Sequence, residues 1–156
     1  MIFIADEMLG KLARWLRMSG FDVLYFRQVS DEELIQKARN EGRILLTRDT
    51  RLIQRLAPNE YLFITQDHLQ EQFLEFFRHF PDLSQDQHPF SRCAECNTPL
   101  EPIEKEKVRG KVWPFVFKTQ DHFTLCPTCR RIYWEATHVR QIRQKLQFLT
   151  RSVADF

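Results

Sequence analysis

Three short apolar runs in the first half of the chain each lead directly into an aspartate. They end at Asp6, Asp49 and Asp67, and the last two share the pattern Thr-x-Asp. In an open parallel sheet, ligands bind at the carboxyl ends of the strands. Strands that each deliver a carboxylate to that edge would form an acidic cluster, which repels itself unless a cation is bound. The pattern therefore predicts the site of a divalent-metal hydrolase.

Helical patterns alternate with strand-like runs along the first 80 residues. We expect strands at residues 2–5, 23–26, 43–47 and 61–65, alternating with helices at 8–19, 31–41, 49–56 and 68–80. The second helix has the clearest signals, because Ser30 and Glu33 form a capping box and Gly42 follows its end. This alternation indicates an α/β fold, with a parallel sheet, right-handed crossovers and helices on both faces.

Composition disfavours several classes of protein. The chain contains only four glycines, and no Gly-rich loop follows a predicted strand, which disfavours nucleotide binding of the Rossmann or P-loop type. No apolar run approaches the ~20 residues of a membrane helix. Asp6 and Glu7 precede any long apolar stretch, so no secretory signal is readable. We therefore expect a cytoplasmic protein that does not contact a membrane.

The character of the sequence changes near residue 81. Residues 81–92 are polar and include two prolines, which is typical of a linker. Beyond them, short β-like stretches lie between two cysteine pairs, and residues 137–151 have the apolar spacing of a closing helix. We predict an α/β domain at 1–80, a linker at 81–92 and a small module at 93–156.

The four cysteines fall into two Cys-x-x-Cys pairs, Cys93 with Cys96 and Cys126 with Cys129. Two such knuckles supply four thiolates, which suits tetrahedral Zn²⁺. The gap between the pairs exceeds the roughly 15–20 residues common in such motifs, so the hairpin between them must be extended. The alternatives are free thiols or two redox pairs, or replacement of a thiolate by a histidine. The candidates for that replacement are His88, His122 and His138. A closed four-thiolate site leaves no position for water, so we predict structural zinc.

The part of the chain after residue 92 is basic, and its cations alternate with aromatic residues. The cations are Arg109, Lys111, Lys118, Arg130 and Arg131; the rings are Trp113, Phe115, Phe117, Tyr133 and Trp134. Such interleaving resembles a nucleic-acid surface, with cations for phosphates and rings for bases. The alternative is that the rings pack the module against its neighbours, and for the rings we favour packing. For the cations neither role is favoured.

Further cations lie near the predicted acidic edge. Lys11, Arg14 and Arg17 recur every three residues along the first predicted helix, and Arg48 precedes Asp49. They could hold a phosphate backbone, or they could simply form solvated helix faces.

Each aspartate also has a structural alternative. Asp31, Asp49 and Asp67 could each cap the N-terminus of a helix, a role worth about 1 kcal/mol. Asp6 is harder to explain in this way, because it follows a strand at the very start of the chain. Together the acids favour Mg²⁺ or Mn²⁺, held by one or two carboxylates with water and substrate phosphate. Such an ion can drive in-line attack on a phosphodiester.

At these residues the chain resembles a PIN-like nuclease. Its first strand, Phe3-Ile-Ala-Asp6, is similar to the opening strand of that fold, where an aspartate leads the active site. The segment from Asp31 to Asp49 is similar to the later half of the fold, in which an aspartate opens a helix and Thr-x-Asp closes the next strand. With residues 7–17 (EMLGKLARWLR) in front and Cys93 to Trp134 behind, the chain specifically resembles the Mut-seven C-terminal RNase family.

The resemblance implies a PIN-like three-layer domain with a parallel sheet, followed by a small zinc ribbon and a C-terminal helix. Asp6, Asp31 and Asp49 would be the metal-binding carboxylates, with Asp67 as an auxiliary acid. Larger PIN domains add an acid from an early helix that this short chain lacks. The candidates to replace it are Glu7, Glu32 and Asp67.

The sequence therefore predicts a ribonuclease that depends on Mg²⁺ or Mn²⁺, carries structural Zn²⁺ and cleaves RNA, most simply single-stranded RNA. The residues expected to hold RNA are Lys11, Arg14, Arg17, Arg48, Arg130 and Arg131. The rival hypothesis is a non-catalytic adaptor that binds RNA or the ribosome through the ribbon, with the acids as helix caps. A third hypothesis is a protein-interaction module with no affinity for nucleic acid.

Overall fold

The first half of the protein is a parallel sheet covered by helices, as the computed structural model shows for the described residues, 1–84, 88–135, 144 and 148. The strands are β1 (Ile2–Ala5), β2 (Asp22–Tyr25), β3 (Ile44–Thr47) and β4 (Tyr61–Phe63). The helices are η1 (Glu7–Leu9), α1 (Gly10–Met18), α2 (Asp31–Glu41), α3 (Thr50–Ile53) and α4 (Leu69–His79). The strand order is β2-β1-β3-β4, and all pairs are parallel. The predicted α/β class is confirmed.

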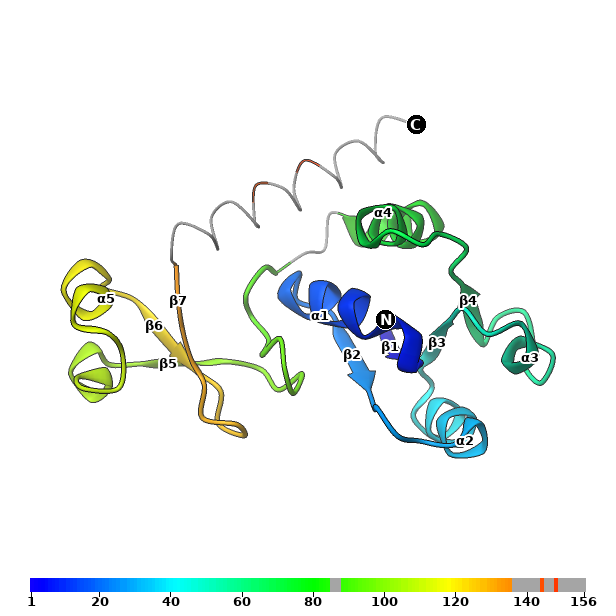
Figure 1. Cartoon of the computed structure of the whole chain (residues 1–156), viewed down its shortest axis with the longest axis horizontal. Helices are drawn as coiled ribbons and strands as arrows, with labels where there is room; N and C mark the ends of the chain where they lie inside the picture. Colours follow the sequence, from blue (N-terminus) through cyan, green and yellow to red (C-terminus); the bar gives the residue numbers. More distant parts are fainter. Residues whose placement is uncertain (85–87, 136–143, 145–147, 149–156) are drawn as a thin grey trace.

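Helices lie on both faces of the sheet, which makes three layers (Figure 1). Helices α1 and α4 pack on one face, where Phe3 and Leu46 point, and the phenylalanine rings of α4 fill that core. Helices α2 and α3 pack on the other face, which receives Ile4 and Leu45. Successive strand residues point to opposite faces, so strands buried on both faces read as continuous apolar runs.

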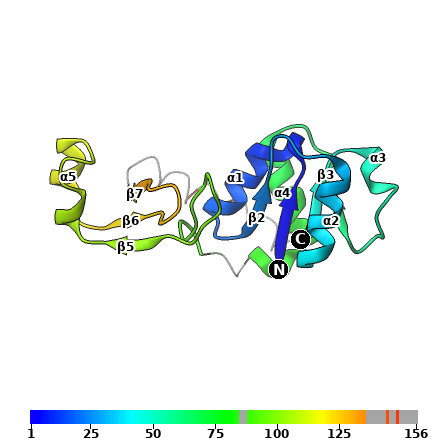
Figure 2. The same ribbon diagram turned by 90° about the horizontal axis from the view of Figure 1, so that it is seen from below.

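The second half contains a three-stranded antiparallel sheet of β5 (Glu101–Ile103), β6 (Phe123–Leu125) and β7 (Ile132–Trp134). Between β5 and β6 lie η3 (Lys105–Val108) and α5 (Pro114–Thr119), at the end of this ribbon furthest from the parallel sheet (Figures 1 and 2). Helix α5 was not expected from the sequence. The predicted helix at 137–151 lies outside the described residues, apart from 144 and 148.

The predicted linker begins as a short helix, η2 (Pro81–Ser84), and later lies against the end of α1. The amides of His88 and Phe90 donate to the carbonyls of Ser19 and Met18 at 3.1 and 2.8 Å. Gly20 allows this approach, because it has φ +100 and a Cβ there would lie 2.5 Å from the His88 carbonyl oxygen. The segment that leads to the first cysteine pair is therefore packed on the α/β part. Among the described helices, none has the length and apolar composition needed to cross a membrane.

Candidate functional site

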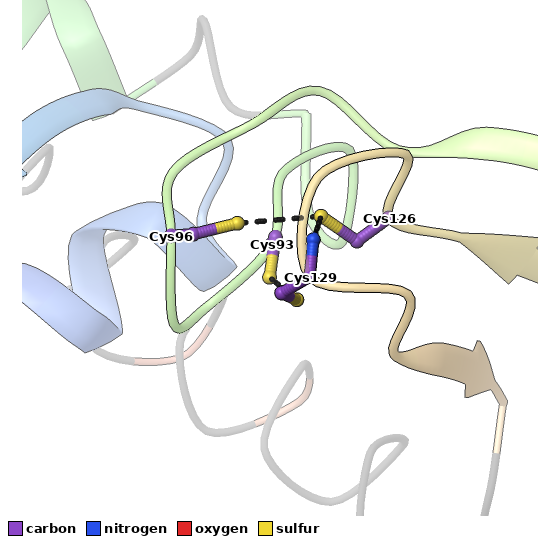
Figure 3. A group of neighbouring side chains, drawn as sticks. All are labelled: Cys93, Cys96, Cys126 and Cys129. Carbon is purple, nitrogen blue, oxygen red and sulfur yellow. Dashed lines mark hydrogen bonds between the residues drawn. The ribbon is translucent and has the colours of Figure 1, made fainter.

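The four cysteines converge between the parallel sheet and the ribbon, where two loops meet (Figure 3). All four Sγ atoms lie within 4.8 Å of one another. The Cys93–Cys129 sulfur atoms are 3.6 Å apart and the Cys96–Cys126 sulfur atoms are 3.3 Å apart. Tetrahedral Zn²⁺ with Zn–S bonds of about 2.3 Å would place its sulfur ligands about 3.8 Å apart. The cluster therefore fits a metal ion such as zinc with little adjustment.

The two knuckles have the same backbone geometry. In each, the residue after the second cysteine has a positive φ, +68 at Asn97 and +63 at Arg130. Its amide donates to the carbonyl of the first cysteine, at 3.0 Å for Cys93 and 2.9 Å for Cys126. This turn aims both thiols of a pair toward one point, which a metal ligand set requires.

Neighbouring groups shift the pKa values of the cysteine thiols. Burial acts to raise the pKa of Cys96, but hydrogen bonding with Thr98 outweighs it and the pKa falls to about 6. Burial raises the pKa of Cys126 to about 11. The hydroxyl of Tyr133 lies 3.0 Å from Cys93 Sγ, where it can donate to a thiolate and orient it. A bound cation would favour the thiolate form of all four.

The first knuckle is fastened to the α/β part by Arg17 and Asn97. Arg17, at the end of α1, is 5% exposed, and its guanidinium donates to the carbonyls of Val23, Ala94 and Glu95 at 2.7, 3.3 and 2.8 Å. The Asn97 side chain accepts from the Val23 amide at 3.0 Å and donates to Asp22 at 2.8 Å. Arg17 was predicted to bind RNA. Because its donors are buried and engaged, we assign it to the junction instead.

A matched pair of arginines on α1 tests the junction. Replacing Arg17 by methionine keeps the apolar stem but leaves three carbonyls without their donor, so we expect the free energy of unfolding to fall by about 3 kcal/mol. The control is Arg14→Met, which removes an ion pair with Glu95 at 2.9 Å whose arginine side chain is 59% exposed. That change should alter stability by less than about 0.5 kcal/mol. Urea unfolding of both variants measures the difference; equal effects would contradict the assignment.

Asp6 lies at the carboxyl end of β1, and its carboxylate is almost fully enclosed. It is 6% exposed, and it accepts from the Met8 amide at 2.9 Å, from the Arg48 amide at 3.1 Å and from the Thr47 hydroxyl. The same Thr47 oxygen accepts from the Asp49 amide at 3.0 Å. Thr47 therefore connects the ends of β1 and β3, which gives the Thr-x-Asp pattern a physical meaning at this strand.

The other predicted acids lie at the same sheet edge but have separate partners. Asp49 caps α3 by accepting from the Arg51 amide at 2.7 Å. Asp31 is exposed and opens α2, where Ser30 is the cap. Asp67 pairs with Arg48, whose hydrogen bond holds the pKa of Asp67 below its usual range. Thr65, in the second Thr-x-Asp, binds Glu75 instead.

The structure does not gather Asp6, Asp31 and Asp49 into one compact ligand group. Within residues 1–84 and 88–135, one group of three or more His, Cys, Asp or Glu side chains has its ligand atoms within 4.8 Å of one another. That group is the four cysteines. Of the candidates for an additional acid, Glu7 is exposed and Glu32 pairs with Arg55. The three acids do not lie within ligand distance of one another, Asp6 is the most enclosed of them, and their joint role in binding a metal stays a prediction.

Two grooves adjoin this edge and share Gly10, Lys11 and Tyr25 in their walls. The first, of about 490 Å³, extends toward Arg48 and Asp67. The second, of about 440 Å³, extends along Arg14 and Arg27 to the first cysteine knuckle. The Tyr25 ring lies over Gly10, where a Cβ would come within 2.7 Å of it. Together the grooves form a path from the acidic edge to the cysteine cluster, lined by more basic than acidic side chains.

The cations of the prediction are distributed over both ends of this path. Lys11, Arg14, Arg17 and Arg48 line the grooves, while Arg130 and Arg131 are exposed beside Cys129. Sequence reasoning missed Tyr25, Arg27 and Asn97 as parts of these sites. The Thr-x-Asp pattern was the one available signal for Thr47.

Comparison with known proteins gives one match. A family model described as Mut7-C RNAse domain matches residues 1–146. No curated protein and no solved structure matches the chain.

Proposed function

The chain belongs to the Mut7-C RNAse domain family, and from this premise we propose a ribonuclease that depends on Mg²⁺ or Mn²⁺ and cleaves single-stranded RNA. The family points to a nuclease with RNA as its substrate. The observation that carries the finer proposal is the position of Asp6, enclosed at the carboxyl edge of the sheet, next to basic grooves. That edge is where open α/β sheets bind their ligands.

The acids of this edge are compatible with Mg²⁺ without forming a complete cage. Mg²⁺ keeps several waters and uses one or two protein carboxylates together with substrate phosphate. We propose Asp6 and Asp49 as those carboxylates, since Thr47 connects the two positions, with Asp31 and Asp67 as auxiliary acids. When bound, the ion would neutralise the scissile phosphate and activate a water.

The residues of the chain have distinct proposed roles. Thr47 donates to Asp6 and fixes the orientation of its carboxylate. Lys11 and Arg14 are exposed along the grooves and would hold phosphates on either side of the reacting one. The Arg48–Asp67 pair lies at the rim, where an incoming phosphate would compete with Asp67 for the guanidinium. Arg130 and Arg131 would contact RNA further along the path.

The rival function, an RNA-binding adaptor without catalysis, also has support. Asp6 caps η1, Asp49 caps α3 and Asp67 forms an ion pair, so each of these acids has a structural role. An adaptor would bind RNA in a strongly salt-dependent way without turnover.

The proposal predicts cleavage of a labelled single-stranded RNA when Mn²⁺ or Mg²⁺ is added to the purified protein, and much slower cleavage of the same sequence in a duplex. Gel electrophoresis of the products measures both rates. Ca²⁺ is the control, because it binds oxygen ligands but with looser geometry than Mg²⁺. Salt-dependent binding with no product under any of these conditions would favour the adaptor.

A further inference from the structure

Two aromatic side chains are exposed at the far end of the ribbon. Trp113 precedes α5 and is 78% exposed, and Phe115 within α5 is 75% exposed. Helix α5 lies at the end furthest from the parallel sheet in both views (Figures 1 and 2). The alternative that all rings of this module serve packing therefore does not hold for these two.

Within residues 93–135, the rings of Phe117, Phe123, Tyr133 and Trp134 do have partners. The Tyr133 hydroxyl contacts Cys93, and the Trp134 ring lies 6.4 Å from that of Phe123. The Phe117 ring is covered by Arg109, 4.4 Å from its centroid, and by Lys105, 5.3 Å from it. Trp113 and Phe115 differ from them because their exposed faces remain available to a ligand.

Cations without ion pairs flank the two exposed rings. Three cations between β5 and β6 form ion pairs with acids of the same connection: Lys105 with Asp121, Lys107 with Glu104 and Arg109 with Glu106. In the part of the chain that the structure describes, Lys111 and Lys118 form no ion pair, and both are exposed. Protein-binding surfaces are depleted of charged residues at their centre. Free lysines alternating with exposed rings instead match the surface of proteins that bind single-stranded nucleic acid.

We propose that Trp113 and Phe115 form a stacking platform for unpaired bases of RNA, with Lys111 and Lys118 contacting the flanking phosphates. This inference rests on the proposed function, because it assigns a second contact to the same substrate. The platform lies at the end of the ribbon furthest from the parallel sheet (Figures 1 and 2), whereas the grooves are lined by residues of α1, β2 and the first cysteine knuckle. A long single strand reaches both places, whereas a short oligonucleotide reaches one at a time. The platform therefore selects for extended, unpaired RNA.

The test compares variants that keep apolar surface with variants that keep a ring. Trp113→Leu and Phe115→Leu remove stacking, and each should weaken binding of an RNA of about 30 nucleotides by about tenfold. Trp113→Phe keeps a ring and should retain most of the affinity. Fluorescence anisotropy in buffer without Mg²⁺ or Mn²⁺ measures binding without cleavage. An oligonucleotide of about 5 nucleotides, bound in the grooves, should be insensitive to both leucine variants.

Charge variants test independently whether the lysines beside the platform contact phosphates. Lys111→Gln should reduce the slope of log affinity against log salt by about one. The control is Lys37→Gln on α2, where the lysine pairs with Glu41, and its slope should be unchanged.

Each outcome decides between the two proposals. Unchanged affinity of the leucine variants for the long RNA would overturn the platform and leave the nuclease proposal intact. Equal losses for the long and short RNA would also overturn it, because the platform would then not act as a second, distant contact. Ring-dependent binding by a protein that cleaves nothing would refute the nuclease and support the platform. Weaker cleavage of long RNA alone by the leucine variants would support both.

Discussion

Cys126→Ser is expected to abolish zinc binding and to leave the ribbon unfolded. The Cys126 thiol is fully buried and lies 3.3 Å from the Cys96 sulfur, so no water or other side chain takes its place easily. The three strands of the ribbon have three residues each. Val108 and Phe123 are among the few buried apolar residues near them. A core of this size depends on its metal, whose apparent binding free energy is on the order of 10 kcal/mol in small zinc modules.

The variant is checked by zinc content, limited proteolysis and tryptophan fluorescence. We expect the loss of one zinc per chain and rapid cleavage between residues 97 and 135. Pro127→Ala is the matched control, because Pro127 is exposed in the same knuckle and supplies no ligand. Stoichiometric zinc and protease resistance in Cys126→Ser would show that the four cysteines are not the ligands.

Zinc loss should also destabilise the parallel sheet, because Arg17 connects the sheet to the first knuckle. The guanidinium donates to the carbonyls of Ala94 and Glu95, which lie between the first two cysteines. Once the knuckle is disordered, Arg17 no longer has these two partners. Replacing Arg17 should then lower the free energy of unfolding by less than it does in the zinc-loaded protein. The two changes are therefore expected to be non-additive, as residues of one network are. A metal ion held by the four cysteines would thus support the parallel sheet as well as the ribbon.

The burial of Arg17 has a geometric cause. A helix turns once in 3.6 residues, so each three-residue step falls about 60° short of a full turn. The series Lys11, Arg14, Arg17 therefore rotates around α1 by about 120° in total. Lys11 and Arg14 remain exposed, while Arg17 enters the buried side. The three-residue spacing alone suggested that all three cations share one face of the helix. Counting the rotation places Arg17 on a different side of α1 from Lys11.

Other elements were readable from the sequence because local and tertiary forces agree there. The strands are buried on both faces and so appear as unbroken apolar runs. Both hydrogen bonds of the capping box of Ser30 and Glu33 are formed, and Gly42 is left-handed with φ +64. Helix α5 was missed because its Phe-Val-Phe core has high β propensity, and Pro114 at its start was the only helical signal.

The sequence predicts at which edge of the sheet the acids lie, but not which side chains contact each carboxylate. Strand ends place Asp6, Asp49 and Asp67 at one side of the sheet, since parallel strands end there together. Which carboxylate is enclosed depends on side-chain contacts between β1 and β3, above all the one from Thr47. Sequence patterns do not contain those contacts.

Asp6→Asn will reduce cleavage of single-stranded RNA by about 10²- to 10³-fold if Asp6 holds the catalytic ion, an effect of the size seen when one electrostatic group is removed from an active site. The change keeps the side-chain volume and removes the charge. An asparagine can still accept from the Met8 amide through its oxygen, but its NH₂ group then takes the other position and accepts from neither Thr47 nor Arg48. A stability loss of about 1–2 kcal/mol is therefore expected as well. Rates must be measured well below the unfolding temperature, with the folded fraction checked by circular dichroism.

Controls separate catalysis from capping. Asp82→Asn changes an exposed aspartate in η2, outside both grooves, and should leave the rate unchanged. Thr47→Val removes the hydroxyl that orients Asp6 and should lower the rate by less than Asp6→Asn, because the carboxylate charge remains. If Asp6 were only a cap, its replacement would lower stability and leave Mn²⁺-dependent cleavage by the folded protein unchanged. A catalytic carboxylate requires a rate that falls far more than the folded fraction does, whereas the adaptor hypothesis requires no Mn²⁺-dependent cleavage by either the parent protein or the variant.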